Sequence, residues 1–518
     1  MIRKLLNPLF FLHLVFVVLI LVGTLPRYLV VYEAGLLAAY FLFAPIEDGI
    51  IFFVRSIPLF IAIPLTAGYD NLNMWRIFSG IIFCRWFFSA ATLRWMRTEF
   101  SVAFKKPMQY MKDHKLHALF HILTLLALLS LWHAPDRVTG LKRIIYFINA
   151  AMIGVVIAHG SNREFLKRLV RNITVPVILV TLAGVIQVVS TYFIDIYQFM
   201  RIWGEGVELR LFGSQWSYIA IHVGNTWFAY FGNQLSLRVF SLFPDSHSFP
   251  IFLLLGLPAF FAWTLVAPLE RAGRLRTMMH TRGKLAVLWI PLIFLMMILS
   301  GTRGIWAAGV AMNVWVIALW AYMRYKKTGQ ELSNTFRYIS CYFIIFFMLF
   351  AVAYPIFSSP QFLVLKGDSL LMQKRLTSIL DFGETSNNQR IEIWKKTAVS
   401  IAHHPILGVG IGNFPVVLGQ NILLSKAGSS AHNIYLHVAA EMGLAALVVF
   451  LYMLWLVIKK IFDNFSGAAS VAEKAYFSGL LITIPWVLAY LMTDVALFDE
   501  RALLLFSVTL GITFAYGE

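Results

Sequence analysis

The side chains best suited to chemistry in this sequence are arginines and one histidine that flank apolar stretches. Arg303 lies in Ser-Gly-Thr-Arg-Gly, at a tight turn between two such stretches, and Arg390 lies on a short amphipathic segment ahead of a glycine-rich run. A guanidinium binds phosphate oxygens through two parallel hydrogen bonds and keeps its charge. We therefore predict that Arg303 and Arg390 hold a pyrophosphate. For Arg303 the alternative is a contact with phospholipid headgroups.

His432 is the best candidate for acid–base chemistry. An imidazole with an ordinary pKa near 6.5 can accept a proton from a hydroxyl at neutral pH. Asn433, His437 and Glu441 follow at four-residue spacing and put polar groups into an otherwise apolar helix, where such groups are expensive. We predict that Glu441 pairs with an arginine of another span and so orients the basic residues of the site. A purely structural histidine is the alternative for His432.

Two further arginines, Arg238 and Arg210, are predicted to contact substrate, with an ordinary surface charge as the alternative for each. Motifs for other chemistries are missing from the sequence. It has no Asp-x-Asp element near an apolar stretch, no Gly-x-x-x-x-Gly-Lys-Ser/Thr loop, no zinc-ligand spacing and no Gly-x-Ser-x-Gly elbow. We therefore predict neither a metal nor a cofactor.

These residues must be positioned by membrane helices. The chain has 518 residues, of which 59% are hydrophobic and only 13% are charged, about half the charged fraction of a soluble domain. Its long apolar stretches are continuous and do not alternate with period two, which indicates helices and excludes both a soluble domain and a barrel. The formal charge of +18 is typical of basic cytoplasmic loops, so a nucleic-acid partner is not predicted. Cys84 and Cys341 fall inside predicted spans and indicate no disulfide.

Fourteen spans are predicted. They cover 9–26, 29–46, 50–67, 75–93, 116–133, 142–159, 173–194, 246–267, 285–301, 304–323, 336–357, 433–458, 475–492 and 499–516. The first is interpreted as a membrane helix and not a signal peptide, because no small-residue cleavage site follows it. Lysines and arginines cluster in alternate loops, which places both termini in the cytoplasm. One acidic inside turn, at Glu47 and Asp48, departs from this pattern.

The spans divide the chain into five segments: an N-terminal bundle (1–194), a first outer loop (195–245), central helices (246–357), a large outer loop (358–431) between the eleventh and twelfth spans, and C-terminal helices (432–518). The first loop is predicted to contain an aromatic interfacial helix over 217–231.

The large outer loop has a readable local structure. A helix is predicted to begin near Gln389, capped by Asn387 or Asn388, and to end before Pro405. The dipole of such a helix would add to an anion site at Arg390. The glycines that follow can bring backbone N–H groups close to a ligand. Ser429 or Ser430 is predicted to cap the next helix.

Several ordered motifs in the C-terminal half resemble those of the O-antigen ligase and Wzy-type polymerase superfamily of bacterial envelope proteins. The matching elements are Ser-Gly-Thr-Arg-Gly (300–304), Arg390 with Trp394, Pro405 with Gly408, Gly410 and Gly412, and His432-Asn433 with Tyr435, Leu436, Glu441 and Gly443. They cover residues 238–510 in family order, whereas the N-terminal half is similar only in its hydropathy pattern. The fourteen spans predicted here exceed the usual count of about twelve for this family, and the expected range is 12–14.

The resemblance implies an all-α, GT-C-like glycosyltransferase of the bacterial inner membrane that works at the periplasmic face. Its donor would be a glycan on undecaprenyl pyrophosphate, and its acceptor lipid A core or a growing polysaccharide. Arg303 and Arg390 would bind the pyrophosphate and His432 would activate the acceptor hydroxyl. Arg238 and Trp394 would contact substrate, together with Asn433, His437 and Glu441.

Two other functions stay open at this point. A transporter or flippase for a lipid-linked polysaccharide is the main alternative, although transporters typically show paired repeats, broken helices and charges at the bilayer midplane. Here the polar residues gather at one predicted face. A non-enzymatic partner in an envelope assembly is the second alternative. The sequence does not separate a ligase from a polymerase.

Overall fold

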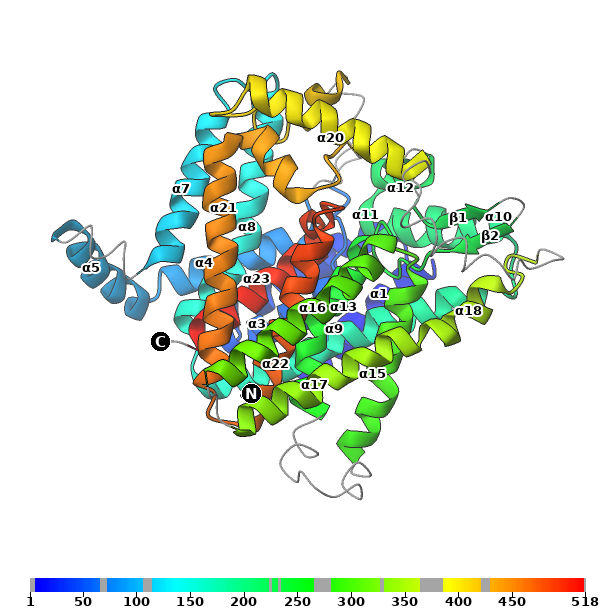
Figure 1. The fold of residues 1–518 in the computed structure, drawn as a ribbon, viewed down its shortest axis with the longest axis horizontal. Helices are drawn as coiled ribbons and strands as arrows, with labels where there is room; N and C mark the ends of the chain where they lie inside the picture. The colour runs from blue at the N-terminus through cyan, green and yellow to red at the C-terminus, as the bar shows by residue number, and fades with distance from the viewer. Residues whose placement is uncertain are drawn as a thin grey trace.

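The computed structural model describes residues 5–65, 72–105, 114–222, 226–231, 234–264, 281–326, 330–363, 385–420 and 429–516. Helices and their connecting turns make up most of these residues (Figure 1). The described strands are β1 (Phe228–Phe231) and β2 (Gln234–Leu237), which form one antiparallel hairpin. The prediction of an all-α membrane protein is confirmed in this general form.

The α-helices are α1 (Leu6–Leu21), α2 (Val30–Phe43), α3 (Ile46–Ser56), α4 (Met74–Phe87), α5 (Ala90–Lys105), α7 (Lys115–Ser130), α8 (Arg137–Gly160), α9 (Arg163–Ser190), α10 (Ile196–Phe199), α11 (Leu209–Phe212), α12 (Ser214–His222), α13 (Ser248–Thr264), α15 (Thr281–Leu299), α16 (Arg303–Tyr325), α17 (Gln330–Met348), α18 (Phe350–Ser358), α20 (Thr385–His403), α21 (Ile434–Ser466), α22 (Val471–Tyr490) and α23 (Glu500–Ala515). Short 3-10 helices are η2 (Arg27–Leu29), η3 (Ile57–Leu59), η6 (Phe414–Leu418) and η7 (Ala496–Phe498), and η4 (Met200–Glu208) is a π-helix.

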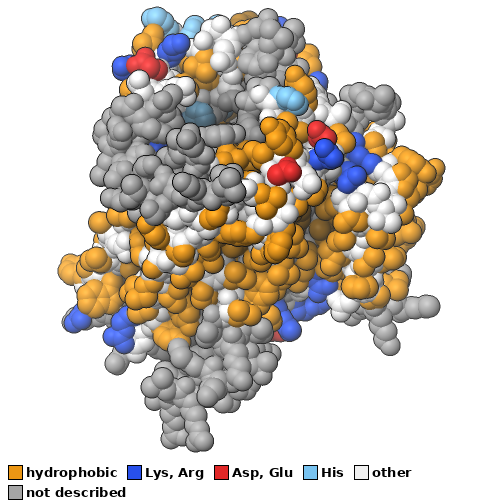
Figure 2. Space-filling view, turned by 90° about the vertical axis from the view of Figure 1, so that its right-hand side faces the viewer, with side chains coloured by type: hydrophobic (Ala, Val, Ile, Leu, Met, Phe, Trp, Pro, Cys, Tyr) orange, Lys and Arg blue, Asp and Glu red, His pale blue; other side chains and the backbone are white. Residues whose placement is uncertain are grey.

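Six described helical segments are long and apolar enough to cross a bilayer: α8, α9, α16, α21, α22, and α17 with α18 taken together. A seventh crossing results if α4 and the start of α5, which meet at 70°, are counted as one span. Four more apolar helices are shorter, among them α1 and α13. Hydrophobic side chains form a band across one face, with charged side chains above and below it (Figure 2). A membrane protein is thus confirmed, but the count of fourteen spans is not.

The predicted third span, 50–67, is helical only in its first part. Helix α3 has 11 residues and would reach about 16 Å, roughly half of the hydrocarbon core. After η3 the chain runs extended, with Phe60 and Ile61 buried. The backbone of Ala62 is satisfied by Leu211, whose carbonyl accepts from its N–H at 2.8 Å, and by Arg27, which donates to its carbonyl at 2.7 Å. Non-helical backbone is tolerated here because protein surrounds it.

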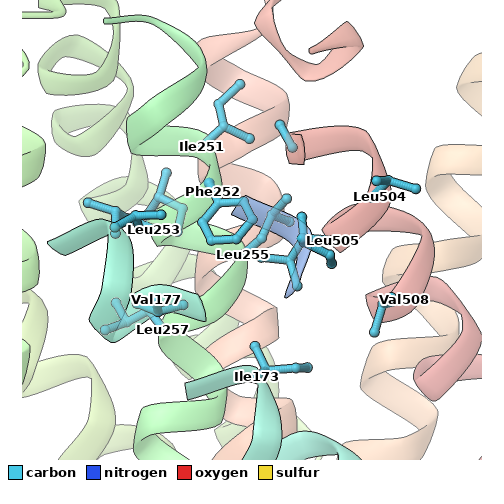
Figure 3. Packing of buried hydrophobic residues seen from close by; sticks show 14 of the residues in the cluster. Ile173, Val177, Ile251, Phe252, Leu253, Leu255, Leu257, Leu504, Leu505 and Val508 are labelled. Atoms are coloured by element: carbon cyan, nitrogen blue, oxygen red, sulfur yellow. The ribbon is translucent and has the colours of Figure 1, made fainter. Parts of the chain in front are cut away.

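Helix α13 is the centre of the bundle, and all of its residues except Trp263 are buried. It packs against α9, α15, α22 and α23. Figure 3 shows part of this core: Ile251, Phe252, Leu253, Leu255 and Leu257 of α13, Ile173 and Val177 of α9, and Leu504, Leu505 and Val508 of α23. Helices α8 and α23 meet through glycines, since a Cβ on Gly511 would lie 2.6 Å from the carbonyl oxygen of Gly154. Small residues let helix backbones approach closely in membranes.

The predicted interfacial helix over 217–231 is only partly present. Helix α12 ends at His222, and residues from Phe228 onward form the β-hairpin, with Phe228 opposite Leu237 and Phe231 opposite Gln234. The two strands are joined in sequence by Gly-Asn, a dipeptide typical of a two-residue hairpin turn. The aromatic residues of this stretch also fit an interfacial helix, and the Gly-Asn dipeptide is the sequence signal that favours a hairpin.

Helix α20 lies across one end of the bundle (Figure 1). It begins at Thr385, so Asn387 and Asn388 lie inside the helix and the predicted cap is wrong. It ends at His403, two residues before Pro405, as predicted. Arg390 consequently lies in the second turn and not at the first residue. The helix dipole, which acts mainly within the first turn, adds less at Arg390 than the sequence indicated.

Candidate functional site

The Ser-Gly-Thr-Arg-Gly segment forms the turn between α15 and α16. Gly301 has a φ of 63°, a conformation that glycine adopts without steric cost. The hydroxyl of Thr302 donates to the carbonyl of Ser246 at 2.8 Å, which ties the turn to the start of α13. Arg303 is half-buried and is the first residue of α16. Its charge therefore stands beside the free N–H groups at the positive end of that helix.

Arg238 follows β2 and is held against the same turn. Its backbone N–H donates to Trp227 at 2.7 Å, and its Nε donates to the carbonyl of Ser300 at 3.3 Å. Burial lowers the pKa of Arg238 to about 10, and the positive charges of Arg303 and Arg390 act in the same direction. Arg238 is still protonated at neutral pH. Arg238 thus lies within electrostatic reach of Arg303 and Arg390, although the three residues come from three separate segments.

The end of α22 fits against the start of α16. The indole of Trp486 donates to the carbonyl of Ile305 at 2.9 Å. Gly304 faces the last residues of α22 so closely that a Cβ there would lie 2.9 Å from the ring of Tyr490 and would also overlap the hydroxyl of Thr493. This contact fixes the turn after α22 next to Arg303.

That turn carries a buried carboxylate, Asp494. The Nδ1 atom of His247 lies 2.9 Å from its Oδ2 atom, and the side chains are 16% and 7% exposed. His247 precedes α13, where Asp245 accepts hydrogen bonds from the N–H groups of His247 and Ser248, each at 2.8 Å. Sequence reasoning identified neither His247 nor Asp494 as a site residue.

Electrostatics link Asp494 to the predicted site residues. Burial by itself would raise the pKa of Asp494, but His247, His432 and Arg390 outweigh that effect and hold it below the ordinary value. Asp494 is therefore ionised at neutral pH. It supplies one negative charge next to the three arginines described above.

His432 precedes α21 in a strained backbone conformation, with a φ of 44°. Strained residues of this kind concentrate at functional sites. Its N–H donates to the hydroxyl of Ser430 at 3.2 Å, whereas its Nδ1 atom is buried and has no hydrogen-bond partner among the described residues. Burial lowers the pKa of His432, Asp494 opposes the shift, and Arg390 adds to it. The imidazole is thus neutral at pH 7 and able to accept a proton.

Asn433 is the cap of α21. Its side-chain oxygen accepts from the N–H groups of Tyr435 at 3.0 Å and Leu436 at 3.1 Å, so the predicted cap at Ser429 or Ser430 is wrong. This oxygen is occupied by the helix, which argues against the substrate contact predicted for Asn433. A loop preceding a helix needs such an acceptor for the free N–H groups.

The start of α21 is clamped to the end of α22. The N–H of Ile434 donates to Leu491 at 2.9 Å, and the hydroxyl of Tyr435 donates to Leu488 at 2.8 Å. His432 is thereby held beside the turn that contains Asp494.

His437 and Glu441 lie one turn apart on α21, and both are buried. The Nε2 atom of His437 is 3.5 Å from Oε1 of Glu441, and that oxygen accepts from the N–H of Phe414 at 3.2 Å. The imidazole stacks on the Phe414 ring at 4.9 Å. The predicted pairing of Glu441 with an arginine of another span is therefore wrong. These two residues fasten η6 to α21.

The glycine run is used for packing. The N–H groups of Val409 and Gly410 donate to the carbonyls of Ala440 and Glu441, each at 2.9 Å. A Cβ on Gly408 would overlap the same stretch of α21, where Gly443 has a φ of 85°. The predicted close approach of backbone to a ligand is thus an approach of backbone to backbone.

Helix α20 is attached above this region by Trp394, whose Nε1 donates to the carbonyl of Ala431 at 2.9 Å. Arg390 lies one turn earlier on the same helix face and is half-buried. Trp394 therefore positions α20, because its hydrogen-bond partner Ala431 directly precedes His432 in the chain.

Arg210 is placed elsewhere by the structure. Its Nη1 donates to the carbonyl of Leu21 at 2.6 Å, and its own carbonyl accepts from Nε of Arg27 at 3.1 Å. A Cβ on Gly23 would lie 2.6 Å from its guanidinium. These contacts fasten α11 to the turn after α1, so Arg210 is left out of the site proposed below.

The arrangement combines three guanidiniums with a neutral imidazole and a buried carboxylate. Among the described residues, no group of three or more His, Cys, Asp and Glu side chains could hold a metal ion. Guanidiniums can neutralise phosphate charge, and a neutral imidazole can accept a proton. The geometry therefore suits transfer chemistry on a substrate that carries phosphate.

A family model described as Wzy_C, O-antigen ligase, matches residues 286–451. The matched segment includes Arg303, Arg390 and His432, and it ends within α21. A comparison with curated proteins found no match. Residues 286–451 are thus similar to the O-antigen ligase family, in the part of the chain where the sequence motifs indicate the same resemblance.

Proposed function

We propose that this protein transfers a glycan from undecaprenyl pyrophosphate to a hydroxyl of an acceptor sugar. The acceptor is lipid A core if the protein is a ligase, or a growing polysaccharide if it is a polymerase. The observation that carries the proposal is the convergence of Arg238, Arg303 and Arg390 with His432 and Asp494. The reaction takes place at the periplasmic face of the inner membrane, with both termini in the cytoplasm, because the basic loops of the sequence alternate in that sense.

The three arginines bind the pyrophosphate and stabilise it as it leaves. Negative charge develops on the bridging oxygen as the bond between the sugar carbon and the phosphate breaks. Fixed cations near a low-dielectric boundary stabilise such charge strongly, because they need no reorganisation during the reaction. In this scheme the guanidiniums supply the positive charge and no metal is required.

His432 acts as the base toward the acceptor. As the acceptor oxygen forms its bond to the sugar carbon, its proton moves to the imidazole. The Asp494 carboxylate then stabilises the imidazolium, as it already favours the charged form of His432. The pair with His247 at 2.9 Å keeps Asp494 in place. The proton of the acceptor hydroxyl thus ends on His432, and the electron pair of the broken sugar–oxygen bond leaves with the lipid pyrophosphate.

The test is transfer by the purified protein from a lipid-pyrophosphate glycan, with and without lipid A core as acceptor. Arg303→Ala and His432→Ala are expected to lower transfer by about 10²-fold or more, the usual contribution of a catalytic base or of a donor to developing charge. Arg324→Ala, at the opposite end of α16, and His404→Ala, on the exposed surface, are matched controls that should retain activity.

Full transfer by both Arg303→Ala and His432→Ala, with unchanged thermal unfolding, would show that the site is assigned incorrectly. Movement of the lipid-linked glycan across a vesicle membrane without a covalent product would instead favour a transporter. The product formed with each acceptor separates a ligase from a polymerase.

A further inference from the structure

A second group of arginines, the pair Arg76 and Arg143, lies near Phe498, at the far end of the turn from Leu491 to Asp499. Arg76, near the start of α4, lies with its guanidinium carbon 5.4 Å from the ring centre of Trp75 and 5.5 Å from that of Tyr146. It is half-buried, and its Nε atom is buried without a hydrogen-bond partner among the described residues. A buried donor of this kind is expensive unless a ligand or water satisfies it.

Arg143, on α8, completes the pair. Its guanidinium carbon lies 5.7 Å from the ring centre of Tyr146, 5.5 Å from that of Phe147 and 5.7 Å from that of Phe498. Tyr146 is therefore shared by both arginines, and its hydroxyl donates to the carbonyl of Phe498 at 2.8 Å. A guanidinium stacked on a ring keeps its N–H donors in the plane, where they can bind an anion at its edge.

Neither arginine forms an ion pair within the described part of the chain. Glu500 follows the turn, but its two oxygens already accept from neutral donors, the amide of Asn73 and the indole of Trp75, each at 2.8 Å. The protein thus holds two cations in a half-buried place, with the Glu500 carboxylate nearby but bonded to neutral donors and in no ion pair with either arginine. Such charges are costly in a protein interior unless a counterion is bound.

The pair lies next to the proposed catalytic residues. Phe498 is in η7, four residues after Asp494, and its ring centre is 6.0 Å from that of His437 on α21. One end of the turn therefore contacts the segment of Arg303, and the other contacts Arg143 and Tyr146, the ring beside which Arg76 also lies. His432 lies two residues before the start of α21, the helix that carries His437.

We propose that Arg76 and Arg143 bind a phosphate or carboxylate group on the acceptor saccharide. This inference rests on the proposed function, because it assigns the second substrate to a second cationic subsite. Binding there would place the acceptor on the opposite side of the turn from the lipid pyrophosphate, so that its hydroxyl can reach His432. A saccharide is favoured over a phospholipid headgroup because the arginines lie beside buried helix contacts, and because Phe498, the ring next to Arg143, packs on His437 of α21.

The experiment measures binding, not turnover. The protein is placed in nanodiscs of phosphatidylcholine and titrated with a hexose oligosaccharide that carries one phosphate monoester, and with the same oligosaccharide after phosphatase treatment. Arg143→Gln and Arg76→Gln are compared with Lys142→Gln, which removes a charge from the neighbouring, exposed position of α8. Each substitution is expected to weaken binding of the phosphorylated probe about tenfold, as for the loss of a hydrogen bond between charged groups. Lys142→Gln and the dephosphorylated probe should show no such difference.

Equal affinity for the two probes, or equal affinity of Arg143→Gln and Lys142→Gln, would overturn the inference. It would also fail if phosphatidylglycerol in the nanodisc protected Arg143 from chemical modification while the phosphorylated saccharide did not, since the site would then hold a lipid headgroup. If the wild-type protein prefers the phosphorylated probe as expected but never transfers a glycan, the proposed function fails while the subsite stands.

Discussion

Gly304 offers the sharpest test of how the site is assembled. It is the second residue of α16 and faces the end of α22, where its missing side chain leaves room for the Tyr490 ring and the Thr493 hydroxyl. In Gly304→Ala the new Cβ would lie 2.9 Å and 3.0 Å from two ring carbons of Tyr490. Ordinary carbon contacts begin near 3.5 Å, so the two helices must separate by about 0.5–1 Å. The turn that carries Asp494 moves with them.

The expected size of the effect follows from that displacement. A shift of about 1 Å in groups that position a reaction can cost roughly 10²-fold in rate. Overpacking of one methyl group destabilises a core by about 1–3 kcal/mol. We therefore expect Gly304→Ala to lower kcat for glycan transfer by about 10- to 100-fold, with a modest fall in the melting temperature and normal membrane insertion.

Gly309→Ala is the matched control, because its Cβ would lie 2.7 Å from the ring of Trp486 on the same pair of helices, but further from Arg303. It should lower the melting temperature by a similar amount and retain more activity. The double variant Gly304→Ala with Thr493→Ala should recover part of the lost rate, because it removes one of the two overlaps. Equal loss of activity in both single alanine variants would refute the reasoning, since the effect would then be one of general stability.

Three further changes test single contacts. Trp394→Phe removes the hydrogen bond to Ala431, which is worth about 1 kcal/mol. Because α20 carries Arg390 and would be held less firmly, the KM for the donor should rise about fivefold. An unchanged KM would contradict this. The kcat/KM for the donor, which reports the free protein, should fall with decreasing pH as His432 becomes protonated, with a midpoint below 6.5 because burial lowers the pKa of the imidazole. In Asp494→Asn that midpoint should move to lower pH, because the carboxylate raises the pKa of His432; a shift to higher pH would count against their contact. Glu441→Gln weakens a buried acceptor of a backbone N–H, so thermal unfolding should show a loss of about 1–3 kcal/mol, and unchanged stability would argue against the contact.

The helices were predictable from hydropathy because each needs only a local apolar run. The predictions of secondary structure were wrong where hydrogen bonds to distant parts of the chain replace those within a helix. Helix α3 ends at Ser56 although the sequence remains apolar, since Leu211 and Arg27 satisfy the extended backbone at Ala62. The paired strands 228–231 and 234–237 carry the same aromatic residues as an interfacial helix, and only the Gly-Asn dipeptide in the sequence between them distinguishes the two. A window of residues cannot detect a partner that lies far along the chain.

The arginines of the candidate site could be singled out from the sequence, because membrane topology does not require a cation at an outer turn. The pair of His247 and Asp494 could not be found in this way. Each lies in a short polar segment beside a span, and such residues are common at helix ends. Only the packing of α13 against α22 brings the two segments within 2.9 Å. The predicted pairing of Glu441 with an arginine was wrong for the same reason, since its partners are His437 and the N–H of Phe414 in η6.

The charge balance around His432 suggests how donor binding and catalysis are coupled. In the free protein, Arg390 lowers the pKa of the imidazole and Asp494 raises it. A bound pyrophosphate would neutralise the arginines and add negative charge of its own, so both effects would raise the pKa. His432 would therefore be a weaker base before the donor arrives and a stronger one afterwards. A base that gains strength only beside its leaving group is less able to activate water in the empty site, which would favour transfer over hydrolysis.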